Sequence, residues 1–155
     1  MSIQNFKKIK IQLHTKCLDF VEQRIANAQL AVNSATESGN DETKSSAGDK
    51  HETGRAMAQL EQEKSGRQLH EALELKKMLD RISPDQESKT VSQGSLVITN
   101  TGNFYLSISI GKIIIENIIY YAVSPATPIA ALLIGKQKMH TFTFNEQFYK
   151  IENVL

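Results

Sequence analysis

The sequence predicts an α+β protein, with a long N-terminal antiparallel helical hairpin followed by a small antiparallel β domain that carries one short helix. The first 83 residues contain no proline and carry apolar residues at helical spacing, whereas the residues after Pro84 form short β-branched runs separated by turn residues. Charge is divided in the same way, because residues 1–90 hold 14 basic and 14 acidic side chains and residues 91–155 hold four and three. We therefore expect a hairpin over residues 1–84, a polar linker over 85–93 and a β-rich domain over 94–155.

The first helix is predicted from an apolar stripe. No proline or glycine occurs between Asn5 and Thr36. Apolar residues recur there at steps of three or four, which places them on one side of a helix: Leu13, Cys17, Val21, Ile25, Ala28, Val32 and Ala35. The side chains of the stripe become smaller toward its end, which permits close approach of a second helix but buries little surface.

A turn-rich segment and a second helical pattern follow. Gly, Asn, Ser and Asp are frequent over residues 38–50, which predicts the hairpin tip there. The second helix is predicted from about His51 to Ile82, where Ser83-Pro84-Asp85 ends it. Two helices of about 30 residues are each about 45 Å long, so the hairpin is predicted to be a rod. The apolar stripe expected on the second helix consists of Met57, Leu60, Leu69, Leu73, Leu79 and Ile82.

The β domain is predicted as an antiparallel meander. Its strands are expected at residues 95–99, 104–110, 113–115, 118–123, 141–144 and 147–151, separated by turn residues such as Glu116-Asn117 and Asn145-Glu146. Residues Pro128–Ile134, closed by Gly135, are predicted as a short helix with proline at its start and a glycine stop.

Composition excludes several classes of protein. The formal net charge is +1, so no global field attracts nucleic acid or membrane. The single cysteine, Cys17, cannot form an internal disulfide, and it is expected to be a small buried hydrophobe, not a nucleophile. The N-terminus lacks an apolar segment of signal-peptide length, and the stretch Ile113–Val123 is too short to span a bilayer. We expect a reduced, cytoplasmic protein.

Two stretches of the sequence resemble a known family. Gly48-Asp49-Lys50-His51-Glu52 resembles the Gly-Asp-x-x-Glu signature that opens the second hairpin helix of the bacterial GreA/GreB-type transcription elongation factors. The segment from Pro128 to Lys136 is similar to the Ser-Pro-Ile-Ala-x-x-Leu-Ile-Gly-Lys segment of their C-terminal domain, with Thr127 in place of the serine. The order of domains also agrees.

The resemblance implies a regulator of RNA polymerase. Its C-terminal domain, FKBP-like in fold, would dock at the rim of the secondary channel, and the hairpin would enter the channel. Carboxylates at the tip would help to hold a second Mg²⁺ in the polymerase active centre, where the polymerase cleaves backtracked RNA. The metal-assisting pair would be Asp49 and Glu52, with Asp41 and Glu42 as helpers, and the docking segment would comprise Pro128, Ile129, Ala130, Leu133, Gly135 and Lys136.

The same resemblance implies that the protein is not itself an enzyme, has no intrinsic cofactor and is a monomer. It would meet the RNA 3′ end and DNA only inside the elongation complex, and it would have no membrane partner. Carboxylates suit the proposed chemistry, because two-metal phosphodiester hydrolysis needs a second hard cation and Mg²⁺ takes one or two donated carboxylates.

Two roles are open for Asp49 and Glu52. Their spacing also matches a capping box at a helix start, which is compatible with the metal role. The tip departs from the family pattern in three ways. It carries about ten extra residues, 39–47, it has basic residues beside the acidic ones, and it lacks the aromatic residue that follows the family's acidic motif. A channel regulator that does not stimulate cleavage is therefore an alternative.

Other functions are compatible with parts of the sequence. Paired helices joined to β structure also occur in prefoldin-like chaperone modules, and the FKBP-like resemblance alone suggests a prolyl isomerase. His51 beside the acidic motif could bind a transition metal. Lys7, Lys8 and Lys10 form a short basic run, typical of a solvated helix start, with phosphate contact as the alternative.

Overall fold

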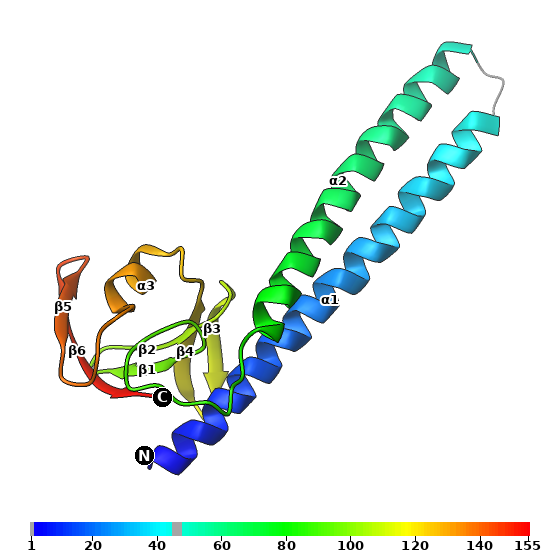
Figure 1. Cartoon of the computed structure of the whole chain (residues 1–155). Helices are drawn as coiled ribbons and strands as arrows, with labels where there is room; N and C mark the ends of the chain where they lie inside the picture. Colours follow the sequence, from blue (N-terminus) through cyan, green and yellow to red (C-terminus); the bar gives the residue numbers. More distant parts are fainter. Residues whose placement is uncertain (1, 45–47) are drawn as a thin grey trace. The chain divides into compact units, whose positions relative to one another are not determined.

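The computed structural model describes residues 2–44 and 48–155, and it describes the side chains of residues 2–40 and 52–155. It confirms the α+β class (Figure 1). Two long helices come first, α1 (Ile3–Lys44) and α2 (Gly48–Asp80). The remaining elements are β1 (Leu96–Thr99), β2 (Asn103–Leu106), β3 (Gly111–Ile115), β4 (Ile118–Val123), α3 (Pro128–Leu133), β5 (Thr141–Phe144) and β6 (Gln147–Val154).

The chain forms two compact units. One is Asp19–Lys77, the helical hairpin, and the other combines Met1–Leu18 with Met78–Leu155, the β-rich unit. The division expected from the sequence follows secondary structure, whereas these units divide both long helices. The first turns of α1 therefore belong with the sheet.

Small residues form the seam of the hairpin unit. Val21, Ala28 and Ala35 are buried at intervals of seven residues on α1. Ala58, Ser65 and Ala72 are buried at the same interval on α2. A repeat of seven residues keeps one line of side chains facing a partner helix, as in coiled coils. Small side chains on both lines allow the two backbones to approach closely.

The second helix differs from its prediction. Met57 and Leu60 are 63% and 65% exposed, and Leu73 is also exposed, so these three residues do not form the seam. The predicted stripe selected large side chains, but the buried line of α2 is made of alanine and serine. The tip is also shorter than predicted, because α1 continues to Lys44 and α2 begins at Gly48.

The sheet is mixed, and this corrects the predicted antiparallel meander. Its strand order is β3-β4-β2-β1-β6-β5. All neighbouring pairs are antiparallel except β2 and β4, which pair in parallel with Phe104 opposite Tyr121. The chain passes from β2 to the edge strand β3, and β4 then returns between β3 and β2. This path makes β4 parallel to β2. The two-residue turns at Glu116-Asn117 and Asn145-Glu146 are confirmed, with positive φ at all four residues as type I′ hairpins require.

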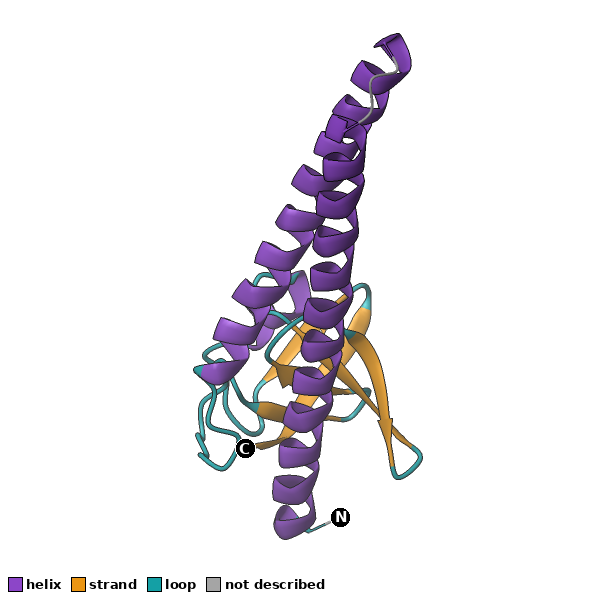
Figure 2. Cartoon of the chain, turned by 90° about the vertical axis from the view of Figure 1, so that its right-hand side faces the viewer, coloured by secondary structure: helices purple, strands orange, loops and turns teal. Residues whose placement is uncertain are grey.

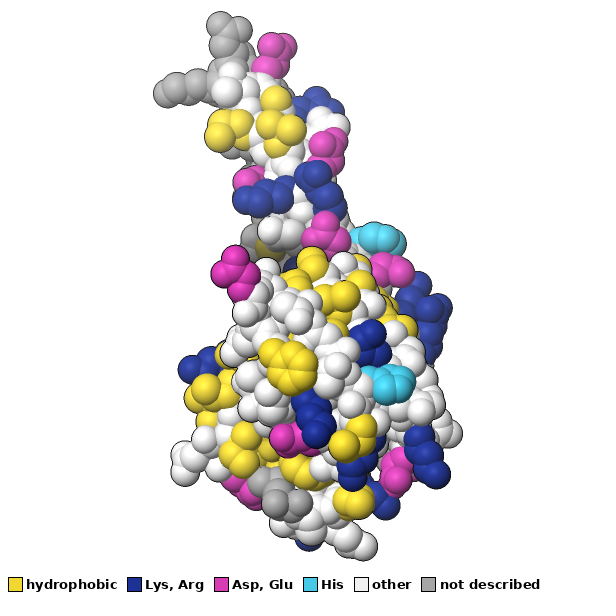
Figure 3. Space-filling model, turned by 90° about the vertical axis from the view of Figure 1, so that its left-hand side faces the viewer, with side chains coloured by type: hydrophobic (Ala, Val, Ile, Leu, Met, Phe, Trp, Pro, Cys, Tyr) yellow, Lys and Arg dark blue, Asp and Glu magenta, His cyan; other side chains and the backbone are white. Residues whose placement is uncertain are grey.

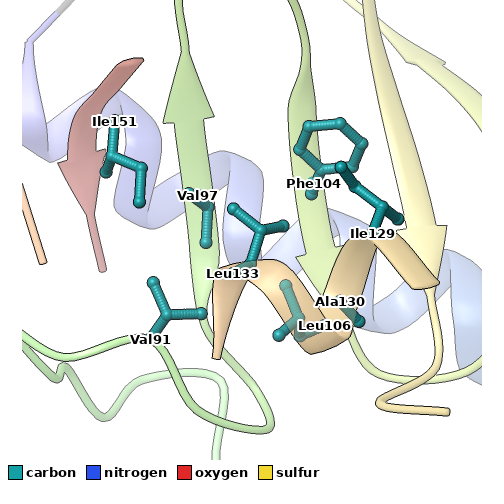
Figure 4. Close-up of a cluster of buried hydrophobic side chains, with 8 residues drawn as sticks. All are labelled: Val91, Val97, Phe104, Leu106, Ile129, Ala130, Leu133 and Ile151. Atoms are coloured by element: carbon teal, nitrogen blue, oxygen red, sulfur yellow. The ribbon is translucent and has the colours of Figure 1, made fainter. Parts of the chain in front are cut away.

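The core on one side of the sheet is formed with α3. Figure 4 shows α3 over the strands with apolar side chains between them. Leu133 and Ala130 of α3 are fully buried there, together with Val97 of β1 and Ile151 of β6. Removing a buried leucine side chain from such a cluster costs about 2–5 kcal/mol. This cluster fixes α3 on the sheet.

The start of α1 covers the other side of the sheet. Figures 1 and 2 both show its first turns beside the strands. Ile9, Leu13 and Cys17 are buried there, and the His14 ring bonds to the Tyr105 hydroxyl of β2. Because neighbouring residues of a strand point to opposite faces, β1 is buried at all four positions.

The segment predicted as a polar linker, residues 85–93, packs onto the β-rich unit. Val91 belongs to the core below α3, and its backbone bonds to Gly135 and Lys136. The Lys10 ammonium donates to the carbonyl oxygen of Gln86 at 2.6 Å. This segment is therefore part of the folded unit.

The seam predicts a strong penalty for a larger residue. Ala72→Leu should lower the free energy of unfolding by about 1–3 kcal/mol, because an added side chain has no room in a closely packed line. Ala56→Leu is the matched control, since Ala56 is exposed on the same helix. Urea unfolding followed by circular dichroism measures both. Equal stability of the two variants would contradict the seam.

At Gly66, in contrast, a substitution is expected to raise the stability of the protein. It lies inside α2, and a Cβ added there meets nothing within 4 Å. Gly66→Ala should therefore stabilise the protein by about 0.5–1 kcal/mol, because alanine loses less conformational freedom in a helix than glycine. Thermal unfolding would show a raised Tm, and an unchanged or lowered Tm would refute this expectation.

Candidate functional site

The acidic motif opens the second arm of the hairpin. Because α2 begins at Gly48, Asp49 is its second residue and Glu52 follows three residues later. Asp49 is thus inside the helix, two residues beyond the N-cap position that a capping box requires, although a carboxylate in a first turn is still favourable. The motif lies at the closed end of the hairpin, as the resemblance implies.

The side chains at this end are described only in part. Glu52 is exposed. The side chains of Asp41, Glu42, Asp49 and His51 lie outside the described residues. Within the part of the chain that the structure describes, no three His, Cys, Asp or Glu side chains are grouped to hold a metal ion.

The predicted docking segment is largely structural. Thr127 caps α3, with its Oγ1 accepting from the amide of Ala130 at 3.4 Å. Ala130 and Leu133 are fully buried in the core, so their side chains cannot form a docking contact, whereas Ile129 is largely buried but lines the groove described next. Gly135 has a φ of +85°, which explains the glycine stop. Pro128 and Gly135 are exposed, and Lys136 is half-buried with its Nζ 6.0 Å from the Phe142 ring centre.

An aromatic groove lies beside this segment. It has a volume of about 340 Å³. Phe104 is its centre, with its ring 6.0 Å from that of Tyr121 and 6.2 Å from that of Tyr149. The remaining lining includes Val123 and Ile129. The parallel pairing that joins Phe104 to Tyr121 was not predicted, because the sequence pattern indicated an antiparallel meander.

Exposed apolar side chains extend the groove along the sheet. Tyr121 is 38% exposed, and Ile114 and Ile119, which are opposite each other on β3 and β4, are exposed as well. Figure 3 shows apolar side chains on the surface of the β-rich unit, with Lys and Arg between them. We call the groove and these two isoleucines the aromatic face. Exposed apolar patches of this kind mark interaction sites.

A second hollow lies within the hairpin unit. It encloses about 490 Å³ and is lined by small residues of both helices, with Met57 and Glu61 at its side. Figure 3 also shows apolar side chains exposed on the hairpin. The hairpin therefore presents an apolar surface in addition to its acidic motif.

Buried polar groups join α1 to the sheet. The His14 Nδ1 and the Tyr105 hydroxyl are 2.8 Å apart, and both side chains are buried. Burial lowers the pKa of His14, which Asp80 opposes and Lys10 reinforces. Burial likewise raises the pKa of Tyr105. These shifts keep both groups neutral, as a packing contact requires.

Cys17 has the role expected of it. Its side chain is fully buried, and its Sγ lies 3.6 Å from the Ser107 hydroxyl. Burial raises the pKa of the Cys17 thiol, so the reactive thiolate is disfavoured.

Comparison with known proteins gives no relatives. No protein-family model, curated protein or solved structure matches this chain significantly. Among the helices that the structure describes, none has the length and apolar character needed to cross a membrane.

His14 makes stability depend on pH. Its folded pKa is below its usual value, so the unfolded chain binds the proton more readily and stability falls as the pH is lowered through and below 6.5. His14→Gln should reduce the loss of stability between pH 7.5 and 5.5, whereas His70→Gln, at an exposed position, should leave it unchanged. Chemical unfolding at each pH measures this. Equal losses in wild type and His14→Gln would contradict the assignment.

Proposed function

We propose that this protein is a Gre-like transcription elongation regulator that binds RNA polymerase in the cytoplasm and inserts its hairpin into the secondary channel. The observation that carries the proposal is the position of the acidic motif, since Asp49 and Glu52 open α2 at the closed end of a two-helix hairpin. A slender hairpin can enter a channel that excludes a globular domain.

The motif also suits the proposed chemistry. Glu52 is exposed, so its carboxylate is free to reach an external metal ion. Mg²⁺ held by a polymerase keeps open positions that one or two carboxylates can fill. In this proposal the polymerase supplies the active centre, and the hairpin supplies oxygen ligands that favour cleavage of backtracked RNA.

The aromatic face is the surface that we assign to polymerase docking. The fully buried residues of the α3 segment cannot touch a partner, but Tyr121 and the groove beside α3 are accessible. Large aromatic side chains in a groove are typical anchors of protein interfaces. The segment contributes to the docking surface through Ile129, which lines the groove.

A second candidate function has its own supporting observation. The hollow in the hairpin and the exposed Met57 and Leu60 would suit a chaperone-like module that holds apolar clients. Such modules are expected to be oligomers, whereas a channel regulator is expected to be a monomer. Solution mass by light scattering separates the two candidates.

The cleavage role predicts loss of activity without loss of fold. Backtracked elongation complexes incubated with the protein and Mg²⁺ should release short 3′ RNA fragments. Asp49→Asn/Glu52→Gln should abolish the release, because it removes both charges and leaves side-chain size unchanged. Glu63→Gln/Glu71→Gln is the control with the same charge change at exposed positions of α2. If the wild type binds polymerase but releases nothing, the non-cleaving alternative holds.

The docking role predicts a loss of affinity. Tyr121→Ser should weaken binding to core RNA polymerase by about tenfold or more, because truncating an interface anchor costs at least about 1.4 kcal/mol. Phe148→Ser is the matched control, because Phe148 is an exposed aromatic residue that does not line the groove. Its neighbour Tyr149 lines the groove, and adjacent residues of a strand point to opposite faces of the sheet. Surface plasmon resonance measures both, and absence of wild-type binding at low salt would refute the proposed function.

A further inference from the structure

A polar cavity lies within the β-rich unit, between the start of α1 and residues 81–95. It encloses about 140 Å³, and its lining includes Lys10, Arg81, Ser83, Ser92 and Gln93. Glu87 is the one acidic residue of the lining. Its carboxylate is ion-paired with Lys7.

Lys10 is buried beside this cavity with unused donors. Lys10 is only 3% exposed, so the solvated helix start expected from the basic run is wrong for this residue, whereas Lys7 and Lys8 are exposed. An ammonium group has three donors, and the structure gives Lys10 one hydrogen bond, to the carbonyl oxygen of Gln86. Burial lowers the pKa of Lys10, while the charges of Glu87 and Asp85 oppose this shift. A buried cation of this kind is costly unless negative charge compensates it.

Other polar side chains around the cavity are exposed and have no partner among the residues that the structure describes. Within the described part of the chain, no hydrogen bond or ion pair engages the side chains of Arg81, Ser83, Ser92 or Gln93. The hydroxyl groups of Ser88 and Ser95, in contrast, are bonded to backbone groups. Two cations, Lys10 and Arg81, therefore line one hollow together with neutral side chains that can donate hydrogen bonds and with the carboxylate of Glu87.

We propose that this cavity binds a small oxyanion of the phosphate class. A cavity of about 140 Å³ has room for several water-sized groups, which suits an ion with four oxygens. Lys10 would contribute charge from the buried side, and Arg81 would add the paired donors with which guanidinium groups bind oxyanions. Ser83, Ser92 and Gln93 would supply neutral hydrogen bonds. The site is independent of the proposed polymerase function.

Thermal unfolding of the full chain tests the site, with inorganic phosphate compared with chloride at equal ionic strength and pH 7.5. Phosphate should raise Tm by about 3 °C at ten times its Kd, and the shift should grow with the logarithm of the phosphate concentration above Kd. Arg81→Gln should weaken phosphate binding at least about tenfold, as expected when a charged hydrogen bond is lost. Arg67→Gln, at an exposed position of the hairpin unit, should leave it unchanged.

Both Arg81 and Ser92 are exposed enough to be changed without unfolding the protein, so Ser92→Ala serves as a second variant with a smaller expected loss. Adenosine 5′-monophosphate and sulfate identify the source of the oxyanion. Tighter binding of the nucleotide than of phosphate would assign the site to a nucleotide phosphate group, and equal binding would assign it to the free ion. The proposal would be overturned if phosphate raised Tm no more than chloride does, or if Arg81→Gln responded to phosphate as the wild type does.

Discussion

The apolar stripe of α1 is the feature on which both units depend. In its first turns the stripe consists of Phe6, Ile9, Leu13 and Cys17, and it buries one face of the sheet. Farther along the same helix it narrows to Val21, Ala28 and Ala35, which form the hairpin seam. Because large residues suit a sheet and small residues suit a closely packed helix, the change in side-chain size along α1 assigns its two parts to different units.

This change in size also explains what the sequence could predict. The stripe of α1 was visible because its members are apolar at helical spacing. The partner line on α2 was not, because it contains Ser65 between two alanines, and larger residues such as Met57 lie on the exposed side. Burial in a close seam selects for small volume, and a search for large apolar residues does not detect that.

The strands were predictable where turn chemistry is local. Glu116-Asn117 and Asn145-Glu146 marked their hairpins correctly, since each turn depends on two adjacent residues. The parallel pairing of β2 and β4 depends on contacts between distant segments, and the sequence pattern does not encode it. The aromatic face was missed for the same reason, because that pairing brings Tyr121 to Phe104, and the pairing of β1 with β2 and β6 brings Tyr149 to it.

The candidate site was likewise predictable only where it depends on a local motif. The position of Asp49 and Glu52 at a helix start followed from a local motif, and the short helix at Pro128 followed from its proline and glycine. The burial of Ile129 and Leu133 did not, because a motif does not show which of its residues maintain the fold. The burial of Lys10 was not predictable either, because it depends on residues 81–95, which lie about 70 positions farther along the chain.

The central claim is that the closed end of the hairpin reaches the polymerase active centre. Cys17 is fully buried, so Glu52→Cys introduces the one accessible thiol of the chain, to which an iron chelate can be attached. In a stalled elongation complex, radicals from that iron should cut polymerase beside its catalytic metal and RNA near its 3′ end. Cuts confined to the outer surface of the polymerase, or none in a complex that has formed, would contradict the account.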